Sequence, residues 1–320
     1  ALRASHHPGI RALLECSRVG AQPLTTEDVA FRIAPRLNAA GRLSKPEIVI
    51  QLLTSTDLDT ARGLARGLHE ANGERRRIEQ KVLQQAVEQA ESILENADRR
   101  SLVVHGEGWH RGVIGIVAAR LVDRHHMPTV VIGFDGDGGR GSCRTPQAVD
   151  LHRALTDCGP HLDRYGGHAA AAGLDIRRTE IEAFSDAFDE AVRGQTESEA
   201  VQRTIDVDLE AEPEDFTIDT AEAIQRLAPF GEANPEPVFV IRGATVAGRA
   251  RLMGQNDAHI SFSIKQAQGA LRVVGFRKAS CFDLTTARCK LDMVVTPMVN
   301  EWKGTRTAEL RLIDIREAAE

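Results

Sequence analysis

The sequence predicts a chain of mixed α/β class, built from a long connecting helix, an α/β domain with a mostly parallel sheet, and a small all-β barrel. Three observations support this prediction. Apolar or small residues recur every three, four or seven positions between residues 60 and 98, the spacing of one helix face. Strand-like and helix-like segments alternate over residues 101–133, which is typical of a β-α-β unit. After Pro237, short alternating strands follow one another.

The length of 320 residues predicts two or three domains. Residues 1–58 precede the long helix, which is predicted over 59–99. At about 1.5 Å per residue such a helix is longer than a small domain, so we expect it to span between two bodies. The α/β domain is predicted over 100–192. Its elements are a strand over 101–105, a helix over 112–125, a strand over 129–133, a glycine-rich loop over 135–141 and a helix from about Gln147 to Leu155.

An acidic linker is predicted over residues 193–228. The stretch 191–228 holds ten acidic and three basic residues, which is typical of a solvated connector. The last domain is predicted over 229–320, with strands over 238–241, 259–264, 271–276, 291–297 and 309–315. Five short strands with glycine-bearing turns favour a barrel of the oligonucleotide-binding type.

The composition excludes several classes of protein. Hydrophobic residues make up 42% of the chain, and no stretch approaches the roughly 18 consecutive apolar residues of a membrane-spanning helix. The five cysteines form no C-x-x-C pair, so we expect neither a disulfide framework nor a zinc knuckle. Unpaired cysteines fit a reducing cytoplasm.

The first candidate site lies in the segment 31–42, where Pro35 is expected to break any helix. Small residues before Gly41 would let the backbone approach a ligand, and Arg36 and Arg42 could clamp a phosphate. By composition alone, a tight helix-to-loop turn is an equal alternative.

The second candidate site is the segment 138–145, directly after the predicted strand 130–134. Glycines at the carboxyl end of a strand can expose backbone N–H groups to anions. Ser142 and Arg144 are two positions apart, so on an extended segment both would point to one side and could grip one phosphate. The segment matches neither a Walker loop nor a dinucleotide-binding fingerprint, and a plain mobile loop is the alternative.

The third candidate site is the segment 165–173. Gly166 and Gly167 precede His168, and the alanines that follow suit a closely packed helix. We therefore expect the imidazole at a helix N-terminus, a position that favours an anionic ligand. A purely structural histidine is the alternative. The pairs His6-His7 and His125-His126 are incidental on this interpretation, because adjacent helical residues do not share a face.

These segments, in this order, resemble the RecJ family of single-strand-specific DNA exonucleases, within the DHH phosphoesterase superfamily. The resemblance covers nearly the whole chain and rests on the residues 8–14, 35–42, 109–118, 141–144, 166–173 and 229–237. It implies that residues 1–58 are the end of a DHH domain, that 100–192 are a DHH-associated domain and that 229–320 are an oligonucleotide-binding barrel.

The resemblance also implies chemistry. The family hydrolyses phosphodiesters with Mn²⁺ or Mg²⁺, bound mainly by an N-terminal domain that this sequence does not contain, so the chain alone is expected to be inactive. His168 is implied as the substrate-binding histidine that reaches toward the scissile phosphate. The implied site for the 5′ phosphate and substrate comprises Arg36, Asn38, Arg42, Ser142, Arg144, Gly166 and Gly167.

The barrel is expected to increase the affinity for the DNA strand. Arg249, Arg251, Arg277 and Lys278 are the candidates for phosphate contact, with a solvated surface as the alternative. Of the aromatic residues Phe239, Phe262, Phe276 and Trp302, we expect most to lie in the core.

The predicted function is therefore part of a 5′-to-3′ single-stranded DNA exonuclease of repair and recombination, in the cytoplasm and without a membrane partner. The resemblance suggests a single-strand-binding protein and a helicase as protein partners. Two alternatives stay open: a non-catalytic single-stranded DNA-binding module, and a phosphodiesterase for short oligonucleotides.

Overall fold

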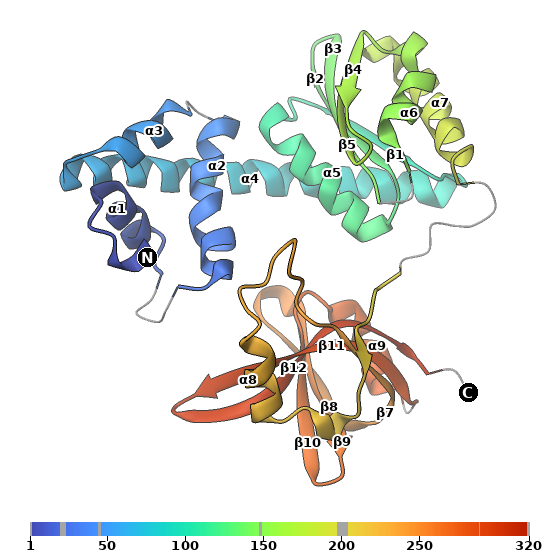
Figure 1. Cartoon of the computed structure of the whole chain (residues 1–320). Coiled ribbons are helices and arrows are strands. Elements are labelled where there is room, and N and C mark those ends of the chain that lie inside the picture. The colour runs from blue at the N-terminus through green and yellow to red at the C-terminus, as the bar shows by residue number, and fades with distance from the viewer. Residues whose placement is uncertain are drawn as a thin grey trace. The chain divides into compact units, whose positions relative to one another are not determined.

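The computed structural model describes residues 2–19, 24–43, 46–146, 149–196, 204–287 and 289–318. The chain divides into two compact units, residues 1–203 and residues 204–320. Each unit is described by itself (Figure 1).

The first unit begins with a group of helices packed on the first half of a long helix. The helices are α1 (Pro8–Cys16), a π-helical turn (Asp28–Ile33), α2 (Ala34–Leu43), α3 (Glu47–Thr54) and the long helix α4 (Leu58–Asn96). Their shared core includes Leu13, Ala40 and Leu52 around Ala61 and Leu68 of α4. The small side chains Ala40 and Ala61 are fully buried there, so neighbouring helices can approach closely.

Pro35 does not break a helix, contrary to the expectation from the sequence. It lies in the first turn of α2, directly after the π-helical turn Asp28–Ile33. The helical backbone runs on through Pro35 from the π-helical turn, in which the Ala34 N–H donates to the Val29 carbonyl, and such π-helical turns are where helices absorb a local irregularity.

The long helix predicted from the periodicity is present as α4, with 39 residues. Its N-cap is Asp57, whose carboxylate accepts a hydrogen bond from the Thr60 N–H at 2.7 Å. Its second half packs through Val82, Ala86 and Ala90 against the α/β part of the unit. The buried Glu79 on this half is neutralised by ion pairs with Arg75 and Arg120. A single helix therefore contributes to two cores of this unit.

The central sheet is mixed, and the prediction of a mostly parallel sheet is wrong. Its strands are β1 (Leu102–Glu107), β2 (Thr129–Asp135), β3 (Gly138–Arg144), β4 (Arg164–Gly167) and β5 (Ala171–Arg177), in the order β1-β2-β3-β5-β4. Only the β1–β2 pair is parallel among these described strands. The segment taken for a glycine-rich loop is mostly strand β3, because the two residues Gly136 and Asp137 are enough to turn the chain back from β2.

Helices cover both faces of this sheet. One face packs against α4 and α5 (Arg111–His125), with Val104, Val113 and Val131 in the core. The other face packs against α6 (Leu151–Asp157) and α7 (Ile181–Arg193), with Phe184 and Phe188 fully buried. The helix predicted from about Gln147 thus begins later, at Leu151, and residues 147–148 themselves lie outside the described residues.

The second unit is a strongly curved sheet. Its strands are β6 (Leu209–Glu210), β7 (Phe239–Ala244), β8 (Val246–Met253), β9 (His259–Gln266), β10 (Gly269–Gly275), β11 (Leu291–Trp302) and β12 (Thr305–Glu317), accompanied by helices α8 (Ile218–Gln225) and α9 (Phe282–Thr286). Only Thr245 separates β7 from β8, yet β7 pairs with β11 and β8 pairs with β9. This bent pair of strands joins the two sides of the sheet into a barrel. The sequence interpretation found the first half of this bent strand and missed β8.

None of the helices in the described ranges is both long enough and apolar enough to cross a membrane.

Candidate phosphate-binding site

A hollow of about 630 Å³ lies where α2, α5 and β3 meet in the first unit. Its lining includes Arg42 at the end of α2, Arg111 and Gly115 on α5, and Ser142 and Arg144 on β3. The predicted site residues Arg42, Ser142 and Arg144 are therefore brought to one hollow by three elements that are distant in sequence.

Strand β3 presents its polar side chains on one face, as the strand period of two requires. Cys143 points into the core and is fully buried, whereas Ser142 and Arg144 are partly exposed. The Arg144 Nη1 group donates hydrogen bonds to the Ser142 Oγ at 3.2 Å and to the Cys143 carbonyl at 2.6 Å. The Arg144 side chain is thus held in one direction before any ligand arrives.

Arg42 is tied to the start of α5. Its Nη1 donates a hydrogen bond to the Gly112 carbonyl at 3.2 Å. The backbones are also close, because a Cβ atom at Gly112 would lie 2.3 Å from the Arg42 carbonyl oxygen. Only glycine at position 112 permits this approach, so the sequence fixes the end of α2 against the start of α5.

His110 caps α5 and lines the same hollow. Its Nδ1 accepts a hydrogen bond from the Gly112 N–H at 3.0 Å. In the neutral ring this bond leaves the proton on Nε2, which can donate to a ligand. His7 caps α1 in the same way, by accepting from the Gly9 N–H, so this member of a pair taken as incidental has a structural role.

The hollow carries a strong positive charge. Four arginines line it (Arg42, Arg111, Arg140 and Arg144), and none of the lining residues that the structure describes is acidic. Arg140 donates from Nε to the Asp175 carboxylate at 3.0 Å, which raises the pKa of the Arg140 guanidinium. Clustered guanidinium groups repel one another, and an anion relieves that repulsion.

Arg36 does not lie in the hollow, and its expected role as a phosphate clamp needs correction. Arg36 is buried, with 8% of its surface exposed. Its guanidinium donates to the His69 Nδ1 at 3.2 Å and to the carbonyls of Arg32 and Cys16. Each of the three guanidinium nitrogens thus has an internal acceptor, which directs the side chain into the helix group and away from the hollow. Asn38 is exposed on α2, one helical turn before Arg42, and does not line the hollow.

His168 is not at a helix N-terminus, contrary to expectation. It follows β4 in the three-residue loop that leads into β5, and its N–H donates to the Ala171 carbonyl at 2.9 Å. Ala171 pairs with Arg144 across β5 and β3, so this loop lies at the Arg144 end of β3. The His168 side chain is exposed and does not line the hollow.

Gly166 and Gly167 have different roles in this hairpin. Gly166 lines a small neighbouring hollow of about 330 Å³ together with Arg140. Gly167 has φ +146°, and a Cβ atom there would lie 2.5 Å from the Ala171 carbonyl oxygen. Gly167 is therefore needed for the turn, while Gly166 leaves open space beside Arg140.

The barrel candidates lie on the second unit. Arg249 and Arg251 are exposed on β8, and Arg249 lines a hollow of about 700 Å³ that also contains Lys290. Arg277 is exposed, and its N–H donates to the His259 Nδ1 at 2.9 Å. The Lys278 ammonium lies 3.8 Å from the Asp314 carboxylate, which compensates part of its charge.

Two of the four barrel aromatics are outside the core, so the expectation that most are buried is wrong. Phe262 is 3% exposed and belongs to the core, and Phe239 packs partly against it. Phe276 is 52% exposed and Trp302 is 71% exposed. Both lie at strand ends, where alternation no longer decides the side-chain environment.

The residues around this arginine-lined hollow do not fit a divalent cation. Mn²⁺ and Mg²⁺ prefer carboxylate oxygen ligands, whereas this lining is rich in guanidinium groups. Within the described ranges there is also no group of three or more His, Cys, Asp or Glu side chains that could hold a metal ion.

The sequence interpretation missed His110, Arg111 and Arg140 as lining residues. The available signal for Arg140 was the same period of two that pointed to Ser142 and Arg144, since the three residues alternate along β3. His110 and Arg111 follow β1 after a short turn, at the edge of the sheet where ligands often bind.

Two family models match the chain. The DHHA1 domain matches residues 79–194, and the RecJ OB domain matches residues 207–314. Among curated proteins, the single-stranded-DNA-specific exonuclease RecJ of Bacillus subtilis is 30% identical and covers 98% of this chain and 40% of that protein. RecJ of Dickeya dadantii is 32% identical and covers 95% of this chain and 54% of that protein. The chain thus spans about half the length of the curated relatives it matches.

Solved structures agree in fold. The crystal structure of RecJ from Thermus thermophilus in complex with Mn²⁺ gives a TM-score of 0.81 at 28% identity, covering 100% of this chain and 45% of that chain. The corresponding complex with Mg²⁺ gives a TM-score of 0.80 at 27% identity and covers 48% of that chain.

Proposed function

We propose that this chain, which combines a DHHA1 domain with a RecJ OB domain and is thereby a RecJ-type chain, supplies the DNA-binding part of a single-stranded-DNA-specific exonuclease. The hollow at Arg42, Ser142 and Arg144 would hold the 5′ phosphate of the strand. The single observation that carries this proposal is the clustering of four arginines in one hollow whose described lining contains no carboxylate.

The residues suit a terminal phosphate for three reasons. Arg144 is oriented by Ser142 and by the Cys143 carbonyl. Because the Ser142 Oγ accepts from Arg144, its own proton is free to donate to a phosphate oxygen. Arg42 enters from a different element, so a phosphate between them would meet guanidinium groups from two sides. A pocket for one end of a strand would set a 5′-to-3′ polarity.

The barrel would bind the strand at a distance from its end. RecJ OB is the matched domain, and barrels of this type bind single strands through basic grooves and stacked bases. We include Arg249, Arg251 and Arg277 in this role, together with the exposed rings of Phe276 and Trp302. His168, exposed in its hairpin loop, is proposed to reach toward the phosphodiester that is cleaved.

The hydrolytic step itself would need Mn²⁺ or Mg²⁺, and we propose that these ions are held mainly by an N-terminal domain outside this sequence, as the resemblance implies. Two Thermus thermophilus RecJ structures are complexes with these metals. On this proposal the chain alone binds DNA without cleaving it. Such an enzyme would act in DNA repair and recombination in the cytoplasm, with a single-strand-binding protein and a helicase as partners.

Binding to labelled oligonucleotides tests the proposal. Single-stranded DNA labelled at its 3′ end, with or without a 5′ phosphate, would be titrated with the chain and followed by fluorescence anisotropy. We expect tighter binding of the phosphorylated strand. Arg144→Gln should lower the ratio of the two affinities about tenfold, which corresponds to the free energy of one charge-assisted hydrogen bond. Affinity should also fall with salt, because bound phosphates release counterions. A wild-type chain that binds neither strand, or that binds without any response to salt, would overturn the proposal.

A second candidate is a single-stranded DNA-binding module that takes no part in hydrolysis. The arginine-lined hollow and the matched RecJ OB domain support this candidate too, because both would bind a strand whether or not hydrolysis follows. Supplying the N-terminal domain of a RecJ relative together with Mn²⁺ separates the two candidates. Release of nucleotides supports the exonuclease, whereas binding without release supports the module. A phosphodiesterase for short oligonucleotides is less favoured, because a dinucleotide would not need the barrel.

A further inference from the structure

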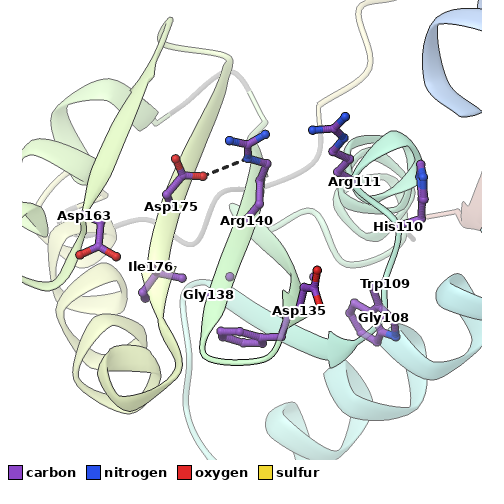
Figure 2. Close-up of a pocket in the computed structure, with 13 residues that line it drawn as sticks. Gly108, Trp109, His110, Arg111, Asp135, Gly138, Arg140, Asp163, Asp175 and Ile176 are labelled. Carbon is purple, nitrogen blue, oxygen red and sulfur yellow. Dashed lines mark hydrogen bonds and ion pairs between the residues drawn. The ribbon is translucent and has the colours of Figure 1, made fainter. Parts of the chain in front are cut away.

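The phosphate hollow continues beyond Arg144 to a second pair of arginines. Arg111 and Arg140 line the hollow of about 630 Å³ and also an adjoining one of about 710 Å³. The adjoining hollow is also lined by Asp135, Asp163 and Asp175, so the excess positive charge lies in the hollow of about 630 Å³, whose described lining holds no carboxylate. Arg140 lines the small hollow of about 330 Å³ as well, so it stands where three hollows meet. In Figure 2 the guanidinium groups of Arg111, on α5, and Arg140, on β3, extend to the same end of the pocket.

The charge in this region exceeds what one phosphate would neutralise. Arg42, Arg111 and Arg144 form no ion pair with any carboxylate in the described part of the chain, and the Arg111 guanidinium has no hydrogen bond with a described residue. A terminal phosphate monoester carries about −1.5 to −2 at pH 7. One such group would leave positive charge uncompensated in the hollow, whereas a second phosphate would balance it.

Arg140 is held in place by Asp175. The two residues are cross-strand partners on β3 and β5, and the Arg140 Nε lies 3.0 Å from the Asp175 Oδ1. This bond uses Nε and leaves the two terminal amino groups of Arg140 without a partner among the described residues. The dashed line in Figure 2 marks this pair. Asp175 therefore orients the Arg140 side chain, while the terminal N–H donors of Arg140 remain available to a ligand.

We propose that Arg111 and Arg140 form a second phosphate subsite beside the one at Arg42, Ser142 and Arg144, with Asp175 as the positioning residue of Arg140. This subsite rests on the proposed function, because it takes a second phosphate of the same bound strand. That phosphate is either the next internal phosphodiester or the β-phosphate of a polyphosphorylated 5′ end. The two sources share one chemistry and are separated by the experiment.

Three single-stranded oligonucleotides of one sequence, ending in a 5′ hydroxyl, a 5′ monophosphate or a 5′ triphosphate, would be titrated with the full chain. Arg111→Gln and Arg140→Gln are each expected to lower affinity by about tenfold on at least one of them, as the loss of one charged contact predicts. A loss on the triphosphate strand alone assigns the subsite to a polyphosphorylated end. An equal loss on all three strands assigns it to an internal phosphodiester.

Arg124→Gln is the matched control. Arg124 lies at the other end of α5, and its side chain is 55% exposed and paired with Glu91, as Arg140 is 55% exposed and paired with Asp175. We expect this variant to bind all three strands as the wild type does. Asp175→Asn should change the affinity for the same strand that Arg140→Gln affects. Its effect should disappear in the Arg140→Gln background, because Asp175 acts through that arginine.

The outcomes are distinguishable. If Arg111→Gln and Arg140→Gln bind all three strands like the wild type while Arg144→Gln loses the monophosphate preference, the second subsite is overturned and the proposed function stands. A wild type that binds none of the strands overturns both. Thermal melting of each variant would confirm that a loss of affinity is not a loss of fold.

Discussion

Gly115 on α5 faces the Ser142 side chain on β3, with too little space between them for an unstrained side chain at position 115. A Cβ atom at Gly115 would lie 3.0 Å from the Ser142 Oγ and 3.2 Å from the Arg144 Nη2. Both atoms are the far ends of side chains that we place in the phosphate site. The helix therefore leaves space at this position for the two groups that would grip a ligand.

Gly115→Ala should weaken phosphate binding without weakening the fold. The added methyl group would displace Ser142 or Arg144 by a few tenths of an ångström, while alanine raises helix stability by about 1 kcal/mol over glycine. We expect a several-fold loss of preference for a 5′-phosphorylated strand and an unchanged or higher melting temperature. Gly67→Ala on α4, where a Cβ atom would meet nothing within 4 Å, is the control. A variant that binds normally would show that this contact does not shape the site.

Ser142→Ala tests the hydroxyl by itself. It removes the Oγ that lies 3.2 Å from Arg144 and would deprive the phosphate of one donor. Because two hydrogen bonds are affected, we expect a loss of roughly tenfold on the phosphorylated strand. The same strand with a 5′ hydroxyl is the internal control, since its affinity should change little. Anisotropy titrations of both strands measure the difference, and equal losses on the two would contradict a terminal-phosphate role.

Local periodicity predicted part of the site, and tertiary packing decided the rest. The period of two correctly placed Ser142 and Arg144 on one side of an extended segment, because β3 is a strand. No local pattern could indicate that Arg42, about a hundred residues earlier, shares their hollow. That relationship depends on the close backbone contact between Arg42 and Gly112. Arg36 was misassigned for the same reason, since burial against α1 and α4 cannot be read from a single helix.

The alanine run after His168 shows how pairing overrides propensity. Alanine favours helices, and the sequence interpretation predicted one. In the structure Ala171 and Ala172 belong to β5, which pairs with β3 on one side and β4 on the other. Two ladders of backbone hydrogen bonds outweigh a preference of less than about 1 kcal/mol per residue. The glycine cluster was also misinterpreted as a loop, since Gly138, Gly139 and Gly141 are residues of strand β3.

The two glycines before His168 should respond differently to substitution. Gly167→Ala forces φ +146° on a residue with a side chain and puts its Cβ 2.5 Å from the Ala171 carbonyl oxygen. We expect a loss of stability of about 1–3 kcal/mol from this strain. Gly166→Ala meets nothing within 4 Å and should melt like the wild type. Urea unfolding of both variants checks the contrast, and equal midpoints would mean that the hairpin adapts at Gly167.

The thiol of Cys143 should be unreactive in the folded chain, although its neighbours Ser142 and Arg144 line the hollow that we propose to bind phosphate. Burial raises the pKa of Cys143 to about 12, and no part of the residue is exposed. At pH 8 the thiolate fraction would be about one part in ten thousand, and the thiolate is the nucleophile. Iodoacetamide at pH 8 should therefore label the partly exposed Cys289 well before Cys143. Peptide mass mapping measures this, with the urea-unfolded chain as the control in which both react. Rapid labelling of Cys143 under native conditions would contradict the packing of β3.

Stability should fall on acidification through the histidine range, and His105 should account for part of the fall. Burial, followed by the nearby charge of Arg178, lowers the pKa of His105. The unfolded chain, with an ordinary histidine pKa of about 6.5, therefore binds a proton more readily than the folded chain. This contribution to stability is present above the unfolded pKa and is lost as pH falls through the folded pKa.

His105→Phe keeps a ring against Phe134, whose centroid lies 5.9 Å from that of His105, and removes the titration. Between pH 7.5 and pH 5.5 the urea midpoint should therefore drop more for the wild type than for His105→Phe. His125, whose pKa burial also lowers, titrates equally in both proteins and cancels in the difference. Identical drops would show that the imidazole of His105 is protonated as easily in the folded chain as in the unfolded one.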